Sequence, residues 1–103
     1  MTMKFLAIMG HEETRPQVRD LFKRFEVLMF SNMSIKGCYC DKGITGQANW
    51  PIDKGVGSYS SLCFAIVEDD KAEQIIAELE NKPIAVEPEF PARAFLMNVE
   101  KMV

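Results

Sequence analysis

The sequence predicts an α+β fold, in which two helices cover one face of a four-stranded antiparallel sheet and the elements follow in the order βαββαβ. Three observations predict this fold. Short apolar runs of strand length alternate with segments whose apolar residues recur at helical spacing. Proline and glycine separate these segments. The chain has 103 residues, 48% of them hydrophobic and 26% charged, which suits a single domain, residues 1–103, with one core.

The first half should form a strand, a helix and a second strand. Residues 3–9 are a short apolar run and predict the first strand. Thr14, Pro16 and Gln17 have the pattern of a helix start with a capping box. Behind them the apolar residues recur at helical spacing, and we expect these to be core: Val18, Leu21, Phe22, Phe25 and Met29. Residues 34–41 alternate in character and predict the second strand.

The second half should add a strand, a helix and a strand. Residues 58–67 become apolar on both faces towards their end, which predicts a central third strand. Asp70 with Glu73 forms a second capping signature, followed by the apolar face of a second helix. A proline-broken stretch, 83–91, leads to the last strand, 94–99. This order is that of a ferredoxin-like sandwich, whose usual strand order is 4-1-3-2.

Both faces of the predicted sheet are apolar. The alternating sets that make both faces apolar are Phe5 and Ala7, Leu6 and Ile8, Leu62, Phe64 and Ile66, Cys63, Ala65 and Val67, and Phe95, Met97 and Val99. Two helices can cover only one face, and an uncovered apolar face would favour aggregation. The simplest cover is another copy of the same chain, so we expect a homo-oligomer.

Charge and cysteine content narrow the function classes. The net charge is -3 with no basic block, so the pattern typical of a nucleic-acid-binding protein is missing. The longest apolar run is too short for a membrane span or a secretion signal, and we expect a soluble, cytoplasmic protein. Three cysteines, an odd number, do not indicate a disulfide framework.

Two segments carry a resemblance to a known family. The run Ile35-Lys36-Gly37-Cys38-Tyr39-Cys40-Asp41-Lys42-Gly43 resembles the end of the second strand of nitrogen-regulatory PII and PII-like signal-transduction proteins, and Phe64-Ala65-Ile66-Val67-Glu68-Asp69-Asp70 is similar to their third strand and helix start. The resemblance implies a non-enzymatic homotrimer that binds a small-molecule effector, typically an adenine nucleotide, between subunits. It also implies that the long loop after the second strand contacts a target protein, such as a membrane transporter or an enzyme.

Four residues are candidates for binding the small-molecule effector. The candidates are Gly37, Lys42, Lys82 and Arg93. Nucleotide-binding members of the family have a glycine-rich loop before the last strand, where backbone N–H groups hold phosphates. Here residues 81–91 contain no glycine, three prolines and the carboxylates of Glu87 and Glu89, which disfavour ATP binding of the usual kind. The cofactor, if any, therefore stays unidentified.

Residues 42–57 predict a long loop between the second and third strands. Four glycines and Pro51 prevent a regular element, and connections of this length are often functional. The resemblance to PII proteins implies that this loop binds the partner protein. A flexible hairpin without a signalling role is the alternative. The candidate residues are Gly43, Gly46, Trp50, Lys54, Gly55 and Gly57.

A metal site is a second hypothesis from a different function class. Cys38 and Cys40 share one face of a predicted strand, and with His11 they could supply three ligands to a transition metal. This would suit a divalent-metal protein of the CutA kind, which has the same trimeric fold. The spacing is not that of a zinc finger, and two small thiols lining a partly buried face are the favoured explanation. An acylphosphatase is disfavoured, because the stretch after the first strand is acidic and has no arginine before Arg15.

Overall fold

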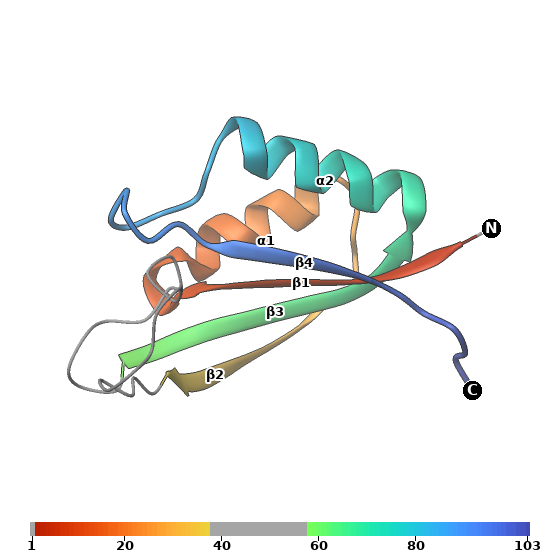
Figure 1. The fold of residues 1–103 in the computed structure, drawn as a ribbon, viewed down its shortest axis with the longest axis horizontal. Helices are drawn as coiled ribbons and strands as arrows, with labels where there is room; N and C mark the ends of the chain where they lie inside the picture. The colour runs from red at the N-terminus through yellow and green to blue at the C-terminus, as the bar shows by residue number, and fades with distance from the viewer. Residues whose placement is uncertain (1, 38–57) are drawn as a thin grey trace, which may run out of the picture.

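The computed structural model describes residues 2–37 and 58–103 and contains the predicted sheet with two helices on one face (Figure 1). The sheet order is β2-β3-β1-β4 and every neighbouring pair is antiparallel, which confirms the predicted α+β class and strand order. The elements are β1 (Met3–His11), a 3-10 turn η1 (Glu12–Thr14), α1 (Arg15–Arg24), β2 (Ser31–Gly37), β3 (Ser58–Glu68), α2 (Asp69–Asn81) and β4 (Arg93–Asn98).

The core lies between the helices and the sheet. In the register of the strands, Leu6 of β1 lies opposite Ala65 of β3 and Leu96 of β4. Both helices contribute an apolar stripe to the same layer, so the side chains interdigitate there. The largest fully buried side chains of this core are Leu6, Ile8, Leu21, Phe22, Cys63 and Ile75.

Helix α1 ends earlier than its apolar spacing predicts. Glu26 has φ of 60°, and its N–H bonds to the Lys23 carbonyl at 3.0 Å, while the Val27 N–H bonds to the Phe22 carbonyl at 2.8 Å. These two bonds form a Schellman motif, which closes a helix with a left-handed residue. The prediction that Met29 belongs to the core was therefore wrong, and its side chain is 86% exposed.

The predicted helix caps were also wrong in detail. Thr14 is the N-cap residue of α1, but its hydroxyl donates to the His11 carbonyl at 2.6 Å and makes no capping bond. The preceding 3-10 turn explains this, since it places that carbonyl within reach of the threonine. Asp69 begins α2 with Glu68 as its N-cap residue, so Asp70 lies within the first turn.

The second strand is shifted towards the N-terminus relative to its prediction. It begins at Ser31 instead of residue 34, because the early end of α1 frees residues 25–30 for the connection. The predicted strand residues 38–41 lie outside the described part of the chain. The other three strands agree with their predictions to within two residues at each end.

No helix within residues 2–37 and 58–103 covers the second face of the sheet. Its side chains come from alternate positions of all four strands, and we call it the open face: Phe5, Ala7, Met9, Met33, Ile35, Leu62, Phe64, Ile66, Phe95 and Met97. Phe5 and Phe64 stack with ring centroids 5.3 Å apart. Met33 and Met97 remain 46% and 53% exposed. Ala7 and Met9 are buried, so in a single copy the exposed large side chains of this face are Met33, Phe95 and Met97.

The two helices are joined by one ion pair on their outer side. Arg24 Nη1 donates to Glu78 Oε2 at 2.8 Å, and this hydrogen bond is the main cause that holds the pKa of Glu78 below its ordinary value of 4.5.

Neither helix in the described part of the chain is long and apolar enough to cross a membrane.

This ion pair predicts a pH dependence of stability. Because the pKa of Glu78 is lower in the folded chain, its stabilising effect is present above pH 4.5 and is lost as pH falls through the folded-state pKa. Glu78→Gln should therefore flatten the dependence of urea-unfolding stability on pH in the acid range. Glu80→Gln, a neighbouring exposed carboxylate, is the control. An equal effect of both substitutions would contradict the assignment.

Candidate functional site

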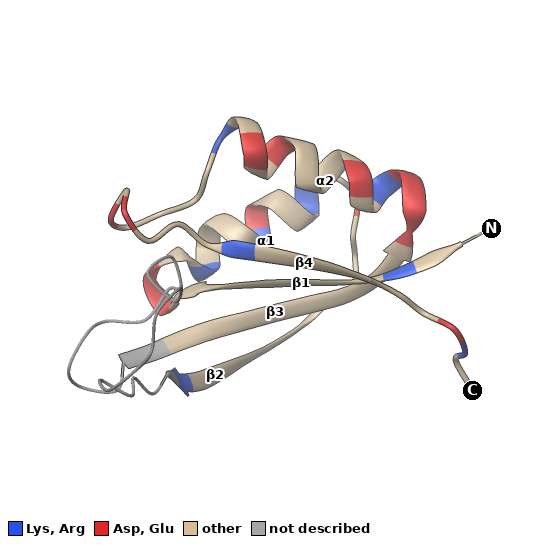
Figure 2. Ribbon diagram, viewed as in Figure 1, with Lys and Arg blue, Asp and Glu red and all other residues tan. Residues whose placement is uncertain are grey.

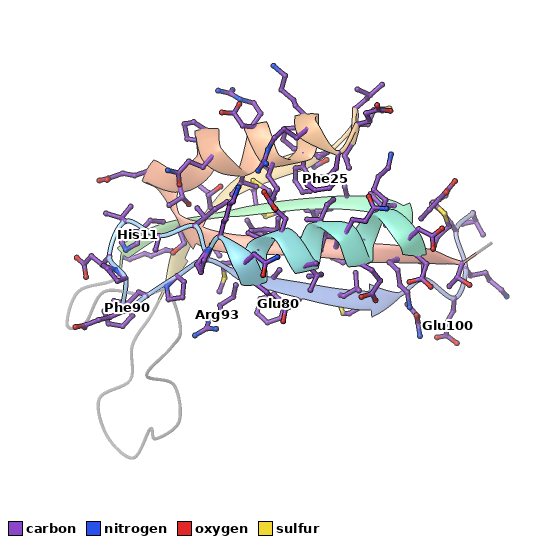
Figure 3. All side chains as sticks on the ribbon, turned by 90° about the horizontal axis from the view of Figure 1, so that it is seen from above. His11, Phe25, Glu80, Phe90, Arg93 and Glu100 are labelled. Carbon is purple, nitrogen blue, oxygen red and sulfur yellow. The ribbon has the colours of Figure 1, made fainter. Side chains whose placement is uncertain are left out.

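Several chain segments meet at the end of the sheet from which residues 38–57 leave, and we call this the loop end. Gly37, the last residue of β2, pairs there with Ser58, the first of β3. Strand β1 ends at His11, which pairs with Ser60. Helix α2 also ends there, and the α2–β4 connection returns the chain to the sheet. Figure 3 shows His11, Phe90 and Arg93 grouped at this end.

The predicted ligand-binding residues that the structure describes all lie at the loop end. Gly37 closes β2, Lys82 follows α2 as its C-cap residue, and Arg93 opens β4 opposite Met9. They do not share one face. The register places Arg93 on the open-face side of the sheet, whereas Lys82 follows a helix on the other side. The remaining candidates lie outside the described residues: Cys38, Cys40, Lys42, Gly43, Gly46, Trp50, Lys54, Gly55 and Gly57.

Two backbone donors of the α2–β4 connection form hydrogen bonds within the connection. The Phe90 N–H bonds to the Glu87 carbonyl at 3.0 Å, and the Ala92 N–H bonds to the Ile84 carbonyl at 2.7 Å. Gly10 packs closely against this connection, since a Cβ at Gly10 would lie 3.0 Å from the Ala92 Cβ. Glu87 and Glu89 are exposed on it. The N–H groups of Phe90 and Ala92 are therefore not available to a phosphate in this conformation.

A polar cluster at the loop end joins the start of α1 to two strands. Arg15 Nε donates to Ser61 Oγ at 3.1 Å, and its Nη2 donates to Ser34 Oγ at 2.9 Å. Ser34 Oγ in turn donates to Glu12 Oε1 at 2.7 Å, and that carboxylate lies 3.6 Å from Arg15 Nη2. Ser61 is buried and also contacts the buried thiol of Cys63 at 3.7 Å.

Arg15 thus holds together the two strands that flank residues 38–57. Bonds from one guanidinium to hydroxyls of β2 and β3 fix α1 relative to both strands. This cluster was not predicted from the sequence. Its signal was present, because Ser61 shares the core-facing alternation of β3 with Cys63 and Ala65, and a serine at such a position needs a partner.

Arg15→Ala is expected to lower the free energy of unfolding by about 1 to 3 kcal/mol, because it leaves the buried Ser61 hydroxyl without its charged donor. Urea denaturation measures this. Arg19→Ala, one turn further along the same helix and exposed, is the matched control and should change stability by less than about 0.5 kcal/mol. Similar losses for both variants would show that the cluster contributes nothing.

A hollow of about 280 Å³ lies at the opposite end of the sheet. It is lined by Met3, Lys71, residues 26–29 of the α1–β2 connection and residues 66–68 of β3. Leu28 at its rim is 87% exposed, and Lys71 Nζ donates to the Glu26 carbonyl at 3.3 Å. The volume is slightly below the range of about 300–1,000 Å³ that is usual for small-molecule sites. None of the predicted ligand-binding residues lines it.

The predicted metal site stays a prediction. Residues 2–37 and 58–103 hold no cluster of three or more histidine, cysteine or acidic side chains that could bind a metal ion. Of the three proposed ligands only His11 belongs to these residues, where it is half-buried at the end of β1.

Solved structures of similar fold identify the architecture. Over 97% of this chain and 87% of the other, the structure of GlnK from B. subtilis matches with a TM-score of 0.69 and 12% sequence identity. A nitrogen regulatory PII-like protein from Thiomonas intermedia, solved with ADP, AMP and bicarbonate, matches over 100% and 98% with a TM-score of 0.65 and 13% identity. A putative PII-like signaling protein from Thermus thermophilus matches over 96% and 87% with a TM-score of 0.64 and 16% identity.

Comparisons of sequence alone add nothing to this: the chain matches no protein-family profile and no curated protein. The structural likeness, at identities of 12 to 16%, establishes that the chain has the fold of PII-like proteins.

Proposed function

We propose that the chain is a PII-like regulator: a non-enzymatic, cytoplasmic homotrimer that senses a small molecule and acts on a partner protein. The open face carries this proposal. Solved structures of this fold include PII-like proteins, and a second copy of the chain would bury the apolar face that the helices leave uncovered. Trimeric assembly then creates the boundaries between copies at which we place the ligand.

The loop end supplies the groups that would hold the ligand. Lys82 and Arg93 lie there on two different sides of the sheet, and Lys42 follows Gly37 by five positions in the sequence. Their cations suit phosphate or carboxylate oxygens. The exposed carboxylates of Glu87 and Glu89, together with the internal bonds of the Phe90 and Ala92 N–H groups, disfavour a triphosphate. AMP, ADP and bicarbonate are the first ligands to test, since one protein of this fold was solved with them.

A thermal-shift screen with AMP, ADP, ATP and bicarbonate tests ligand binding, because a ligand that binds only the folded chain raises its stability. We expect a concentration-dependent rise of the melting temperature with at least one of these compounds, and a smaller rise with ATP. Lys82→Ala and Arg93→Ala should weaken the response, whereas Lys71→Ala, at the hollow at the other end, should leave it unchanged. The reverse pattern would place the ligand in that hollow, and no response to any compound would contradict ligand sensing.

We assign the binding of the partner protein to residues 42–57. Arg15 bonds to both strands that flank this segment, β2 and β3. A ligand that displaces Arg15 would therefore alter the position of both strands. A membrane transporter or an enzyme is the class of target. The only tryptophan of the chain, Trp50, lies in this segment and is suited to anchor the contact.

The metal-binding alternative rests on Cys38, Cys40 and His11. If they form a site, the purified chain should retain about one divalent ion per copy, and Cys38→Ser together with Cys40→Ser should remove it. Metal content by mass spectrometry decides this. A metal-free protein that still responds to AMP, ADP or bicarbonate favours the regulator.

A further inference from the structure

The carboxylate of Glu12 is held at the loop end by groups that suit a carboxylate ligand. Its Oε1 accepts a hydrogen bond from Ser34 Oγ at 2.7 Å and lies 3.6 Å from Arg15 Nη2. A hydroxyl and a guanidinium together fit a small anion, because the guanidinium presents its N–H groups as a planar fork. We call Arg15 and the two serines to which it donates, Ser34 and Ser61, the arginine site.

The guanidinium of the arginine site has a fixed direction. Ser61, of which only 3% is exposed, accepts from Arg15 Nε at 3.1 Å, and Ser34 accepts from Nη2 at 2.9 Å. The two serines lie opposite each other in the register of β2 and β3, so both are carried by paired strands. A group that is already oriented loses little conformational freedom when a ligand binds, and this favours binding.

The pair between Glu12 and Arg15 is loose and open to solvent. Its separation of 3.6 Å is longer than the about 2.7–2.9 Å of a strong charge-assisted hydrogen bond. The side chains of Glu12 and Arg15 are 45% and 34% exposed. A dissolved anion can therefore reach the guanidinium without any opening of the core, and the exposed ion pair that it replaces contributes little to stability.

We propose that the arginine site binds the carboxylate group of a small monoanion, and that Glu12 is an internal competitor which this ligand displaces. One oxygen of the ligand takes the hydrogen bond from Ser34 that Glu12 now accepts. The other oxygen accepts from the guanidinium of Arg15, whose fork fits the two oxygens of a carboxylate. The site lies within one copy, on the helix side of the sheet, and is separate from the groups of Lys82 and Arg93.

The charge around the arginine site favours a monoanion over a phosphate. Glu12 and Glu13 both belong to the η1 turn that leads into α1, and Figure 2 shows acidic residues at this turn. A displaced Glu12 stays close to the ligand because it belongs to the same turn. A phosphate dianion would meet these carboxylates with a surplus negative charge after pairing with Arg15, whereas a monoanionic carboxylate pairs with Arg15 one to one.

Ligand binding at this site breaks one contact and keeps two. The hydrogen bond between Glu12 and Ser34 ties η1 to β2, and the ligand takes its place. The bonds from Arg15 to Ser34 and Ser61 remain, so α1 stays fixed to β2 and β3. The η1 turn is therefore the element whose position depends on this ligand.

Titration of the full chain with sodium acetate tests the proposal. Two-dimensional NMR follows the Arg15 Nε–H and the backbone amides of Glu12 and Ser34, while acetate replaces chloride at constant ionic strength. We expect saturable shifts of these signals, and binding of sodium phosphate that is at least about threefold weaker. Shifts confined to other residues, or tighter binding of phosphate than of acetate, would overturn the proposal.

Sodium bicarbonate carries the same planar group and should move the same signals. The tighter of the two anions identifies the class of ligand, an organic carboxylate or bicarbonate. If neither anion moves the signals of the arginine site, the proposal is wrong.

Three substitutions separate displacement of Glu12 from general charge repulsion. Glu12→Gln should tighten acetate binding by about two- to fivefold, the range that an exposed ion pair accounts for. Glu13→Gln, which removes a charge from the same turn, is the matched control and should change the affinity by less. Ser34→Ala, at an exposed strand position where the fold tolerates the change, should weaken binding. Equal tightening by Glu12→Gln and Glu13→Gln would contradict the displacement of Glu12.

The arginine site does not depend on the proposed function, and the two can fail separately. Lys82→Ala with Arg93→Ala should leave the acetate titration unchanged. If this double variant loses the response to acetate while Ser34→Ala retains it, the arginine site is wrong and ligand sensing between copies stands. Acetate binding at Arg15 in a chain that proves to be monomeric would overturn the homotrimer alone.

Discussion

Replacing Phe64 by aspartate is expected to abolish assembly of the chain. Phe64 lies on β3, one of the two central strands, and its ring stacks on Phe5 in the middle of the open face. If a second copy covers this face, the substitution buries a carboxylate without a partner, which costs several kcal/mol per copy. We expect monomers or insoluble protein in place of a particle near the mass of three chains, measured by light scattering at micromolar concentration.

Val86→Asp is the matched control for this prediction. Val86 is a large exposed apolar residue like those of the open face, with 46% of its surface accessible, but it lies in the α2–β4 connection. Its substitution should leave the mass unchanged. A soluble Phe64→Asp variant with the wild-type oligomeric mass would show that the open face is not the contact between copies.

Phe22→Ala should lower the free energy of unfolding by about 3 to 5 kcal/mol. The ring of Phe22 is fully buried between α1 and the sheet, and it packs on Phe30 with centroids 4.9 Å apart just before β2 begins. Its removal leaves a cavity that surrounding side chains fill only in part. Urea unfolding at a fixed chain concentration measures the loss.

Phe25→Ala, at the end of the same helix, is the comparison. Phe25 is only half-buried, so its substitution should cost less than that of Phe22. Equal losses for the two variants would contradict the position of the core between α1 and the sheet.

The fold could be predicted from the sequence because its signals are local and agree with one another. The two-sided apolar character of residues 62–67 predicts a central strand, and β3 indeed lies between β2 and β1. Met29 shows the limit of such reasoning. Its spacing continues the apolar stripe of α1, but the helix has already ended in backbone bonds to the Lys23 and Phe22 carbonyls. These bonds require Glu26 to adopt a left-handed conformation. Glycine is the usual residue in that conformation, so a glutamate there does not indicate a helix end.

The candidate site was harder to predict because its residues come from distant parts of the chain. Gly37, Lys82 and Arg93 were expected near strand and helix ends, where they lie, but only the sheet register shows that Arg93 is on the side away from the helices. The Arg15 cluster depends on pairing between residues 19 and 46 positions apart, which no local pattern specifies.

The fluorescence of Trp50 tests the central claim, that a small ligand controls the segment that contacts the partner protein. Trp50 is the only tryptophan, so its emission reports on residues 42–57 without a label. A ligand can shift a conformational equilibrium only if it binds the two states unequally. On addition of whichever of AMP, ADP or bicarbonate stabilises the protein, we predict a blue shift of this emission, together with protection of Lys42 and Lys54 from trypsin. An emission spectrum and a cleavage rate that stay the same at saturating ligand would contradict the account.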